Sequence, residues 1–302
     1  MGRKKNKGRA VHGVVLLDKP LKLSSNHALQ RVKRLFNANK AGHTGSLDPL
    51  ATGMLPICLG EATKISAFLL NANKTYRFKC KLGEKTTTGD AEGDVIERLP
   101  FEHIQLSDIE KVLPELTGDI MQVPPMYSAL KKEGQRLYDL ARQGIVVERK
   151  ARPVTIYSLT LLSYEAGEVE LEAHCSKGTY VRTLAEDLAI KLNCCAYVTE
   201  LRRITVGPYQ THMITLEHLE SLAEDGFDSL DAVLQALDSA ILDWPKVELD
   251  DDSAYYIKLG QPVQISRAPT EGLVRIYDEA GFIGVGKIQD NGCIAPKRMM
   301  NL

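Results

Sequence analysis

The chain has 302 residues, 44% hydrophobic and 25% charged with a net charge of −1, which is typical of a globular protein with one large domain and a small one. No run of about 18 apolar residues occurs, and the basic start MGRKKNKGR lacks a signal peptide's apolar core, so we expect a cytoplasmic protein with no membrane span. The six cysteines form no CxxC pair or Cys/His ligand spacing, which argues against a disulfide framework and a zinc site.

The first 43 residues are strongly basic. They hold eleven Lys/Arg against one acid, Asp18, a balance of +10, whereas residues 215–252 hold twelve Asp/Glu against Lys246 alone, a balance of −11. This segregation would let a polyanion dock on one surface while the acidic surface faces elsewhere. A disordered basic tail beside a solvated pair of acidic helices explains the pattern equally well.

The N-terminal elements begin with a buried strand in VHGVVLLDKP (11–20). SSNHALQRVKRLFN (24–37) predicts a helix capped by Ser24 or Ser25. After a loop, EATKISAFLL (61–70) predicts a short helix. KTYRFKCKLG (74–83) alternates apolar and polar residues, which is typical of a half-buried strand with a basic outer face.

The middle of the chain predicts elements in blocks. EKTTTGDAEGDVIE (84–97) indicates a flexible hairpin, residues 107–118 a helix, and residues 121–144 a Pro-Pro turn running into another helix. Strands at 153–164 and 168–176 precede a helix at 178–193. Because strands and helices do not alternate strictly, we predict an α+β fold with a mixed or antiparallel sheet.

The last third predicts a second domain. Residues 215–242 indicate one or two acidic helices, and DWPKVELDDD (243–252) marks a boundary. Residues 253–302 alternate short strands and turns, which predicts a compact all-β tail. We therefore expect a larger domain at 1–248, with a basic extension at about 1–10, and a small domain at 249–302.

One acid stands out in the loop GHTGSLDPLATGMLP (42–56): Asp48 lies between a leucine and a proline, with no acidic neighbour in sequence before Glu61. The motifs GxSxG, GxxxxGK[ST] and GxGxxG do not occur. An Asp-Pro turn or a cap of the turn at Pro49 would explain Asp48 without function. Alternatively, the acid is held beside apolar residues, needs a cation to stay ionised, and acts as a nucleophile toward an electrophilic carbon.

Four ordered blocks resemble the pseudouridine synthases of the TruB family, which modifies uridine 55 in the tRNA T loop. They are GHTGSLDPLATGMLPICLGEATK (42–64), KTY (74–76), CSKGTYVRTLAEDLA (175–189) and LRRITVGPY (201–209). EGLVRIYDEAGFIGVGKI (271–288) and GCIAPKR (292–298) resemble the small PUA-like domain of the bacterial members. The resemblance implies a catalytic domain with a mixed, largely antiparallel sheet flanked by helices, followed by an all-β PUA-like domain.

The resemblance also implies roles for seven residues. Asp48 is the nucleophile and Arg182 the cation paired with it, although an ion pair with Glu186 on the same helix would be the ordinary explanation of Arg182. Tyr76 stacks on the target uracil, and Tyr180 and Leu201 belong to the substrate pocket, where each alone would pass as a packing residue. His43 fills the stack that the everted base leaves, and Lys64 neutralises a phosphate; an ordinary loop histidine and an exposed helical lysine are the alternatives.

The resemblance implies tRNA as the partner and a monomeric enzyme that needs no metal or cofactor, because the product of the isomerisation has the same atoms as the substrate. The basic N-terminal region, the Lys/Arg face of residues 77–81 and Arg202–Arg203 are expected to contact phosphates, and the PUA-like domain to contact the acceptor end. Two other functions fit a similar site: a base-excising N-glycosidase that releases uracil, and a non-catalytic RNA chaperone.

Overall fold

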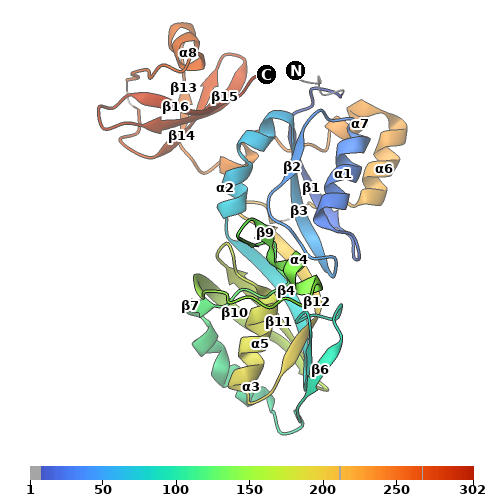
Figure 1. Cartoon of the computed structure of the whole chain (residues 1–302). Helices are drawn as coiled ribbons and strands as arrows, with labels where there is room; N and C mark the ends of the chain where they lie inside the picture. The colour runs from blue at the N-terminus through green and yellow to red at the C-terminus, as the bar shows by residue number, and fades with distance from the viewer. Residues whose placement is uncertain (1–7, 211, 267) are drawn as a thin grey trace.

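The computed structural model describes residues 8–210, 212–266 and 268–302, so most of the predicted basic extension lies outside the described residues. Figure 1 shows a large α+β part with two lobes and a small strand-rich part beside the upper lobe. The upper lobe holds the first three strands with α1, α6 and α7, and the lower lobe holds the later strands with α3 and α5. Long strands run from one lobe into the other, so one sheet connects them.

That sheet has eight strands. Its order is β1-β3-β12-β4-β11-β10-β7, with β2 paired to β3, and only the β3–β12 pair is parallel. The mixed, largely antiparallel sheet predicted from the sequence is therefore confirmed. The strands are β1 (Gly13–Lys19), β2 (Ala41–His43), β3 (Ala51–Leu59), β4 (Lys74–Leu82), β7 (Gly118–Gln122), β10 (Arg152–Glu165), β11 (Glu168–Cys175) and β12 (Ala196–Val206).

The helices mostly follow the predicted pattern. Helix α1 (Ser25–Leu35) is capped by Ser24, whose Oγ accepts the N–H of His27 over 3.2 Å. The helix expected at 107–118 is shorter, because Pro114 and Gly118 favour its ending: α3 (Leu106–Val112) passes into the 3₁₀ turn η2 (Leu113–Leu116) before β7. The other helices before β12 are η1 (Gly60–Lys64), α2 (Ser66–Asn71), α4 (Leu137–Arg142) and α5 (Val181–Lys191).

Two short hairpins extend from the sheet. One pairs β5 (Glu84–Thr86) with β6 (Val95–Arg98), as the turn-rich segment predicted. The other pairs β8 (Lys131–Lys132) with β9 (Gln135–Arg136) and leads directly into α4. The turn of the first hairpin and the segment that precedes the second both contact Arg182 of α5, and these contacts help to form the site described below.

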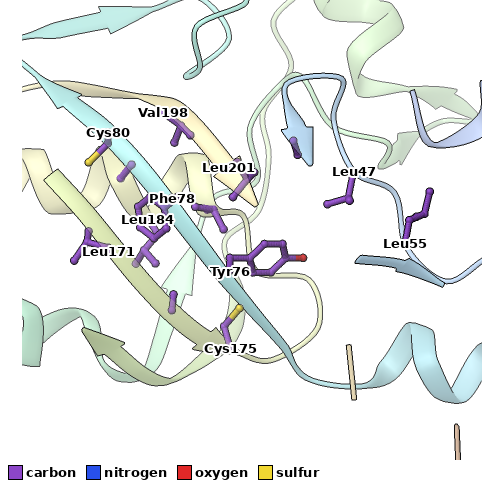
Figure 2. Packing of buried hydrophobic residues seen from close by; sticks show 14 of the residues in the cluster. Leu47, Leu55, Tyr76, Phe78, Cys80, Leu171, Cys175, Leu184, Val198 and Leu201 are labelled. Carbon is purple, nitrogen blue, oxygen red and sulfur yellow. The ribbon is translucent and has the colours of Figure 1, made fainter. Parts of the chain in front are cut away.

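The main core lies between the sheet and its helices. Alternation along β4 buries Tyr76, Phe78, Cys80 and Leu82 on one face, as predicted. Each large apolar side chain buried in this way contributes about 1.5–3 kcal/mol to stability. Figure 2 shows Phe78 among Leu171, Leu184 and Leu201, whereas the Tyr76 ring extends beyond them toward Leu47. Tyr76 thus ends the packed face at the loop that carries Asp48.

The acidic segment does not face away from the basic region. Helices α6 (Leu216–Asp225) and α7 (Phe227–Asp231) lie beside α1 in the upper lobe, with Leu216, Leu219 and Leu230 in the main core. Ion pairs join the two regions: Arg31 with Glu220, and Arg9 with Asp231 over 2.5 Å. The prediction of separate basic and acidic surfaces is wrong here, because an amphipathic acidic helix packs its apolar face against the basic helix.

The C-terminal domain is rich in strands, in the order β13 (Lys246–Glu248), β14 (Leu273–Asp278), β15 (Gly281–Ile288), β16 (Ile294–Met299). It also contains a helix that the all-β prediction omitted, α8 (Asp251–Lys258), capped by Asp250 and buried through Ala254 and Ile257. Asp250, Asp251 and Asp252, which end the segment predicted to mark the domain boundary, form the cap and first turn of this helix. The predicted boundary at 248/249 stays a prediction, and the pairing of β13 with β14 favours one just before Lys246.

A partly buried ionic cluster attaches this domain to the preceding segment. Asp238, which precedes the 3₁₀ turn η3 (Ser239–Ile241), accepts from Arg275 over 2.8 Å and also from the Tyr277 hydroxyl. Both partners belong to β14, and Arg275 Nε also donates to the Trp244 carbonyl over 3.0 Å. Val285 and Met300 of the C-terminal domain pack with core residues of the large part. The cluster and this packing hold the two parts together.

Candidate functional site

The loop that carries Asp48 connects β2 to β3, and we call residues 44–50 the Asp48 loop. Ser25, buried at the start of α1, fixes it: its Oγ accepts the Leu47 N–H over 2.7 Å and donates to the Leu47 carbonyl over 2.9 Å. The Asp48 carbonyl also accepts the N–H of Ala51 over 3.0 Å. A serine considered only as a helix cap therefore positions the loop.

The Asp48 carboxylate pairs with Arg182 of α5. Its Oδ2 lies 2.8 Å from Arg182 Nη2, and the Arg182 side chain is only 7% exposed. The same guanidinium donates to the backbone carbonyls of Thr88 and Tyr127 over 2.8 and 2.7 Å. The structure thus brings together two residues 134 positions apart in the sequence, and the alternative of a helical ion pair between Arg182 and Glu186 is not adopted.

A second carboxylate approaches the same arginine. Asp90, in the turn between β5 and β6, is 3% exposed, and its Oδ2 lies 3.5 Å from Arg182 Nη1. Its Oδ1 accepts from the Thr88 hydroxyl over 2.5 Å and from the Glu92 N–H over 3.1 Å. Only a turn-rich segment was predicted around this acid, because the hairpin meets α5 only in the folded chain.

The ionisation of Asp48 reflects opposing influences. Burial raises the pKa of the Asp48 carboxyl above its ordinary value, Arg182 lowers it, and the neighbouring Asp90 raises it again. Although protein atoms surround it closely, 44% of its side-chain surface remains accessible, because it faces a cavity. Arg182 therefore opposes the rise in the pKa of Asp48 that burial and Asp90 cause.

The start of α5 has its own support from β7. Gln122 is buried at the end of that strand, and its Oε1 accepts the N–H of Tyr180 over 3.0 Å. Its Nε2 donates to the Tyr180 carbonyl over 3.4 Å. One amide thus holds both backbone groups of the residue that precedes α5, which orients Tyr180 and, two residues on, Arg182.

The cavity beside Asp48 has a volume of about 520 Å³. It brings together five of the seven predicted site residues, which come from the Asp48 loop, β4, α5 with its N-cap, and β12. These are Asp48, Tyr76, Tyr180, Arg182 and Leu201. Tyr76 is 9% exposed, and burial raises the pKa of its hydroxyl and that of Tyr180. One carboxylate, two un-ionised phenols and a leucine would suit an uncharged planar ring.

Two buried cations, Lys74 and Arg203, also line this cavity. Arg203 is fully buried, and its guanidinium donates to the carbonyls of Met54 and Gly45 over 2.7 and 3.2 Å. The Lys74 ammonium donates to three carbonyls at the end of α2, and burial lowers its pKa to about 8. Within the described ranges neither forms an ion pair with a carboxylate, so both add positive potential to the site.

The other two predicted residues lie outside the cavity lining. His43 ends β2, next to the Asp48 loop; burial and then Arg203 lower the pKa of its imidazole, which favours the neutral form. Lys64 pairs with Glu61 over 2.5 Å and donates to the Met299 carbonyl over 2.8 Å. Its ammonium is therefore engaged at the contact with the C-terminal domain, and its contacts do not favour a role in phosphate binding.

The cations of β4 and Arg202, which were predicted to meet phosphates, already have carboxylate partners. Arg77 pairs with Glu172, Lys79 with Glu200, Lys81 with Glu84, and Arg202 with Asp18, at 2.7–3.3 Å. By contrast, residues 131–152 hold seven Lys/Arg against three acids, and the described ion pairs include none of them. The sequence analysis missed this segment, which lies beside the cavity at Arg152.

Among the described residues, no cluster of three His, Cys, Asp or Glu side chains is arranged to hold a metal ion. No helix in the described ranges is long and apolar enough to cross a membrane.

Comparison with family models covers most of the chain, from residue 33 to residue 300. Residues 33–181 match the model "TruB family pseudouridylate synthase (N terminal domain)". Residues 182–242 match "tRNA pseudouridylate synthase B C-terminal domain", and residues 245–300 match "Pseudouridine synthase II TruB, C-terminal". The models cover Asp48, Tyr76, Tyr180 and Arg182 as well as the strand-rich tail.

Individual proteins agree. The tRNA pseudouridine synthase B of Ectopseudomonas mendocina is 54% identical over 303 residues, covering 99% of both chains, and that of Serratia proteamaculans is 52% identical over 310 residues, covering 99% of this chain and 98% of that protein. The structure also resembles a chain of a Cbf5–Nop10–Gar1 complex, at 25% identity and TM-score 0.71, covering 95% of this chain and 84% of that one. An H/ACA RNP bound to a substrate RNA shares the fold, with TM-score 0.73 and 22% identity, covering 100% and 92%.

Proposed function

This chain belongs to the TruB family of pseudouridine synthases, and on that premise we propose that it isomerises uridine 55 in the T loop of tRNA to pseudouridine. The fold, an α+β catalytic part with a strand-rich C-terminal domain, agrees with the family. The observation that carries the proposal is the pairing of Asp48 with the buried Arg182 at the wall of a cavity that can hold a nucleoside.

The proposed reaction moves one bond. The N1–C1′ bond of uridine breaks, the uracil turns, and C5 bonds to C1′; C5 loses a proton and N1 gains one, so the atoms balance. Asp48 is proposed as the group that acts on the nucleoside, and Arg182 as the cation that keeps it ionised and aimed. Tyr76, with its ring at the end of the packed face, is proposed to stack on the uracil while Leu201 and Tyr180 confine it.

Binding is proposed to require an everted uridine, since the cavity receives a base that has left its stack. His43, at the end of β2 next to the Asp48 loop, is proposed to fill the vacated stack. The cation-rich segment 131–152 is a better candidate for phosphate contacts than the paired cations of β4. Action as a monomer, in the cytoplasm, without metal or cofactor, and contact of the C-terminal domain with the acceptor end stay predictions.

The test is to incubate the protein with unmodified tRNA, digest the RNA to nucleosides and analyse them by mass spectrometry. We expect a mass-neutral conversion at position 55 and none in tRNA with cytidine there. Free uracil and an abasic site would instead support the N-glycosidase. Binding without any change in the nucleosides would support the RNA chaperone.

Asp90→Asn is expected to slow turnover roughly 100-fold, because the guanidinium loses one of its two carboxylate partners and a small misplacement of a catalytic group has an effect of this size. The variant should also shift the acid limb of the pH profile. The reaction needs ionised Asp48 and is lost as pH falls through its raised pKa. Asp90 contributes to raising that pKa, so its neutralisation moves the limb to lower pH. Single-turnover rates across pH would measure both effects.

Asp94→Asn is the matched control, because Asp94 lies on the same hairpin but is exposed and forms no ion pair among those of the described residues. An Asp90→Asn profile that coincides with that of the control would contradict the proposed role of the second carboxylate.

A further inference from the structure

The mouth of the cavity carries two exposed cations. Arg152 begins β10, Lys177 follows β11, and both line the cavity. In the part of the chain that the structure describes, neither forms an ion pair with a carboxylate, unlike the cations of β4. Lys177 Nζ instead donates to Asn71 Oδ1 over 2.8 Å. The mouth is therefore a place where positive charge remains available to an anion.

An aromatic pair adjoins this mouth on the outer face of the sheet. The rings of Tyr157 and His174 lie 5.0 Å apart at 37°, and Tyr157 is 49% exposed. The Tyr157 hydroxyl donates to Asn73 Oδ1 over 3.4 Å, two residues from the Asn71 that holds Lys177. These contacts join the aromatic pair to the rim, and we call Arg152, Tyr157, His174 and Lys177 the rim patch.

A break in strand pairing accounts for the exposure of Tyr157. The register of β10 against β11 shifts between Ile156, paired with Cys175, and Ser158, paired with His174. Tyr157 is the extra residue of this bulge. A bulge redirects the side chain of its unpaired residue and is common beside functional sites. Packing of the core does not require a large aromatic ring at this exposed position.

The neighbouring surface is electrically neutral, which sets the rim patch apart. Along β4 and β11 the outer face carries ion pairs such as Arg77–Glu172 at 3.1 Å, and toward the cavity it continues with Thr75 and Thr205, joined by a hydroxyl hydrogen bond of 2.9 Å. Unpaired positive charge and an exposed tyrosine, which contacts the half-buried His174, thus coincide at the cavity mouth. Cations beside exposed aromatic rings are the composition that binds single-stranded nucleic acid.

We propose that the rim patch binds the RNA strand next to the everted uridine, with a flanking base stacked on Tyr157 and its phosphates contacting Arg152 and Lys177. This inference rests on the proposed function for the identity of the strand. The stacking is sequence-tolerant, since every base has a π face, and the phosphate contacts depend on salt.

The test is equilibrium binding of a T-arm stem-loop RNA at several salt concentrations, measured by fluorescence anisotropy, with single-turnover conversion in parallel. Tyr157→Ala is expected to weaken binding about tenfold with an unchanged salt dependence, as the loss of one stacked base predicts. Tyr157→Phe keeps the ring and should bind like the unaltered protein. Arg152→Gln and Lys177→Gln should each reduce the slope of log K against log salt by roughly one.

Arg77→Gln is the matched control, an exposed cation of the same sheet that already has a carboxylate partner, and its slope should not change. Thermal unfolding checks each fold, and Tyr157→Leu replaces the alanine variant if that one does not fold. Undiminished RNA binding by Tyr157→Ala or Tyr157→Leu would overturn the inference. Equal slopes of log K against log salt for Arg152→Gln, Lys177→Gln and Arg77→Gln would also overturn it. If the unaltered protein binds the RNA but makes no pseudouridine, the proposed function fails separately.

Discussion

Replacing Asp48 with Asn is expected to abolish isomerisation, with a loss of at least about 10⁴-fold in single-turnover rate, because the amide has the shape of the carboxylate but neither its charge nor its nucleophilicity. The partners of the loop should remain, since Ser25 holds it through the backbone of Leu47 rather than through Asp48. RNA affinity should therefore stay within about threefold of the original value, which corresponds to less than 1 kcal/mol.

The measurement is the nucleoside assay under single-turnover conditions, combined with RNA binding by the same variant. Asp94→Asn serves again as the control for a change from carboxylate to amide at an exposed position. Turnover by Asp48→Asn at an undiminished rate would remove the proposed nucleophile and with it the mechanism. Loss of binding together with turnover would point to a structural role of the loop.

Arg182→Met should have the second-largest effect, because it leaves two carboxylates, Asp48 and the buried Asp90, without the cation between them. We expect turnover to fall about 10³-fold, in the range found for removing a charged group from a preorganised site. The pKa of Asp48 should rise, since burial and Asp90 then act on it without Arg182, so the acid limb moves to higher pH, opposite to Asp90→Asn. Breaking a buried pair should also cost about 3–5 kcal/mol of stability.

Urea unfolding and the pH profile together measure these effects. Lys191→Met is the matched control, a partly exposed cation of the same helix whose partner is the exposed Glu115, and a surface pair of this kind contributes at most about 1 kcal/mol. Arg182→Lys keeps the charge but loses the planar fork, so it should recover stability more than rate. If the acid limbs of the pH–rate profiles shift in the same direction in the Arg182 and Asp90 variants, Arg182 and Asp90 do not have the opposite effects on the pKa of Asp48 that are assigned to them.

Local patterns allowed much of the fold to be predicted. The strand β4 was predicted from apolar residues at every second position, and the start of α1 from a serine before an amphipathic run. Both patterns lie in consecutive residues and can be recognised without tertiary contacts. Helix α8 was missed because Asp250, Asp251 and Asp252 resemble a solvated linker as closely as a cap with its first turn. These aspartates fit a linker as well as the start of a helix, and only the burial of Ala254 and Ile257 shows that they start a helix.

The residues of the candidate site that the resemblance implied were predicted from the sequence. The residues that join the site only through tertiary contacts were not. Nothing near Asp90 in the sequence indicates that its hairpin returns to α5, or that Gln122 holds the backbone before that helix. The predicted phosphate-binding cations failed for a similar reason. Arg77, Lys79 and Arg202 have partners from other strands, which lie 95, 121 and 184 residues away in the sequence.

The ionic cluster of Asp238 with Arg275 and Tyr277 bears on how the chain meets a large ligand. Because these groups are largely covered and mutually neutralised, swinging the C-terminal domain would expose charges that have lost their counterparts. The orientation of the C-terminal domain relative to the large part is therefore fixed in the folded protein. Little conformational entropy of inter-domain motion remains to be lost when an RNA binds. With the predicted contact between the C-terminal domain and the RNA, this fixed orientation would favour ligands whose two contact points lie at the matching distance.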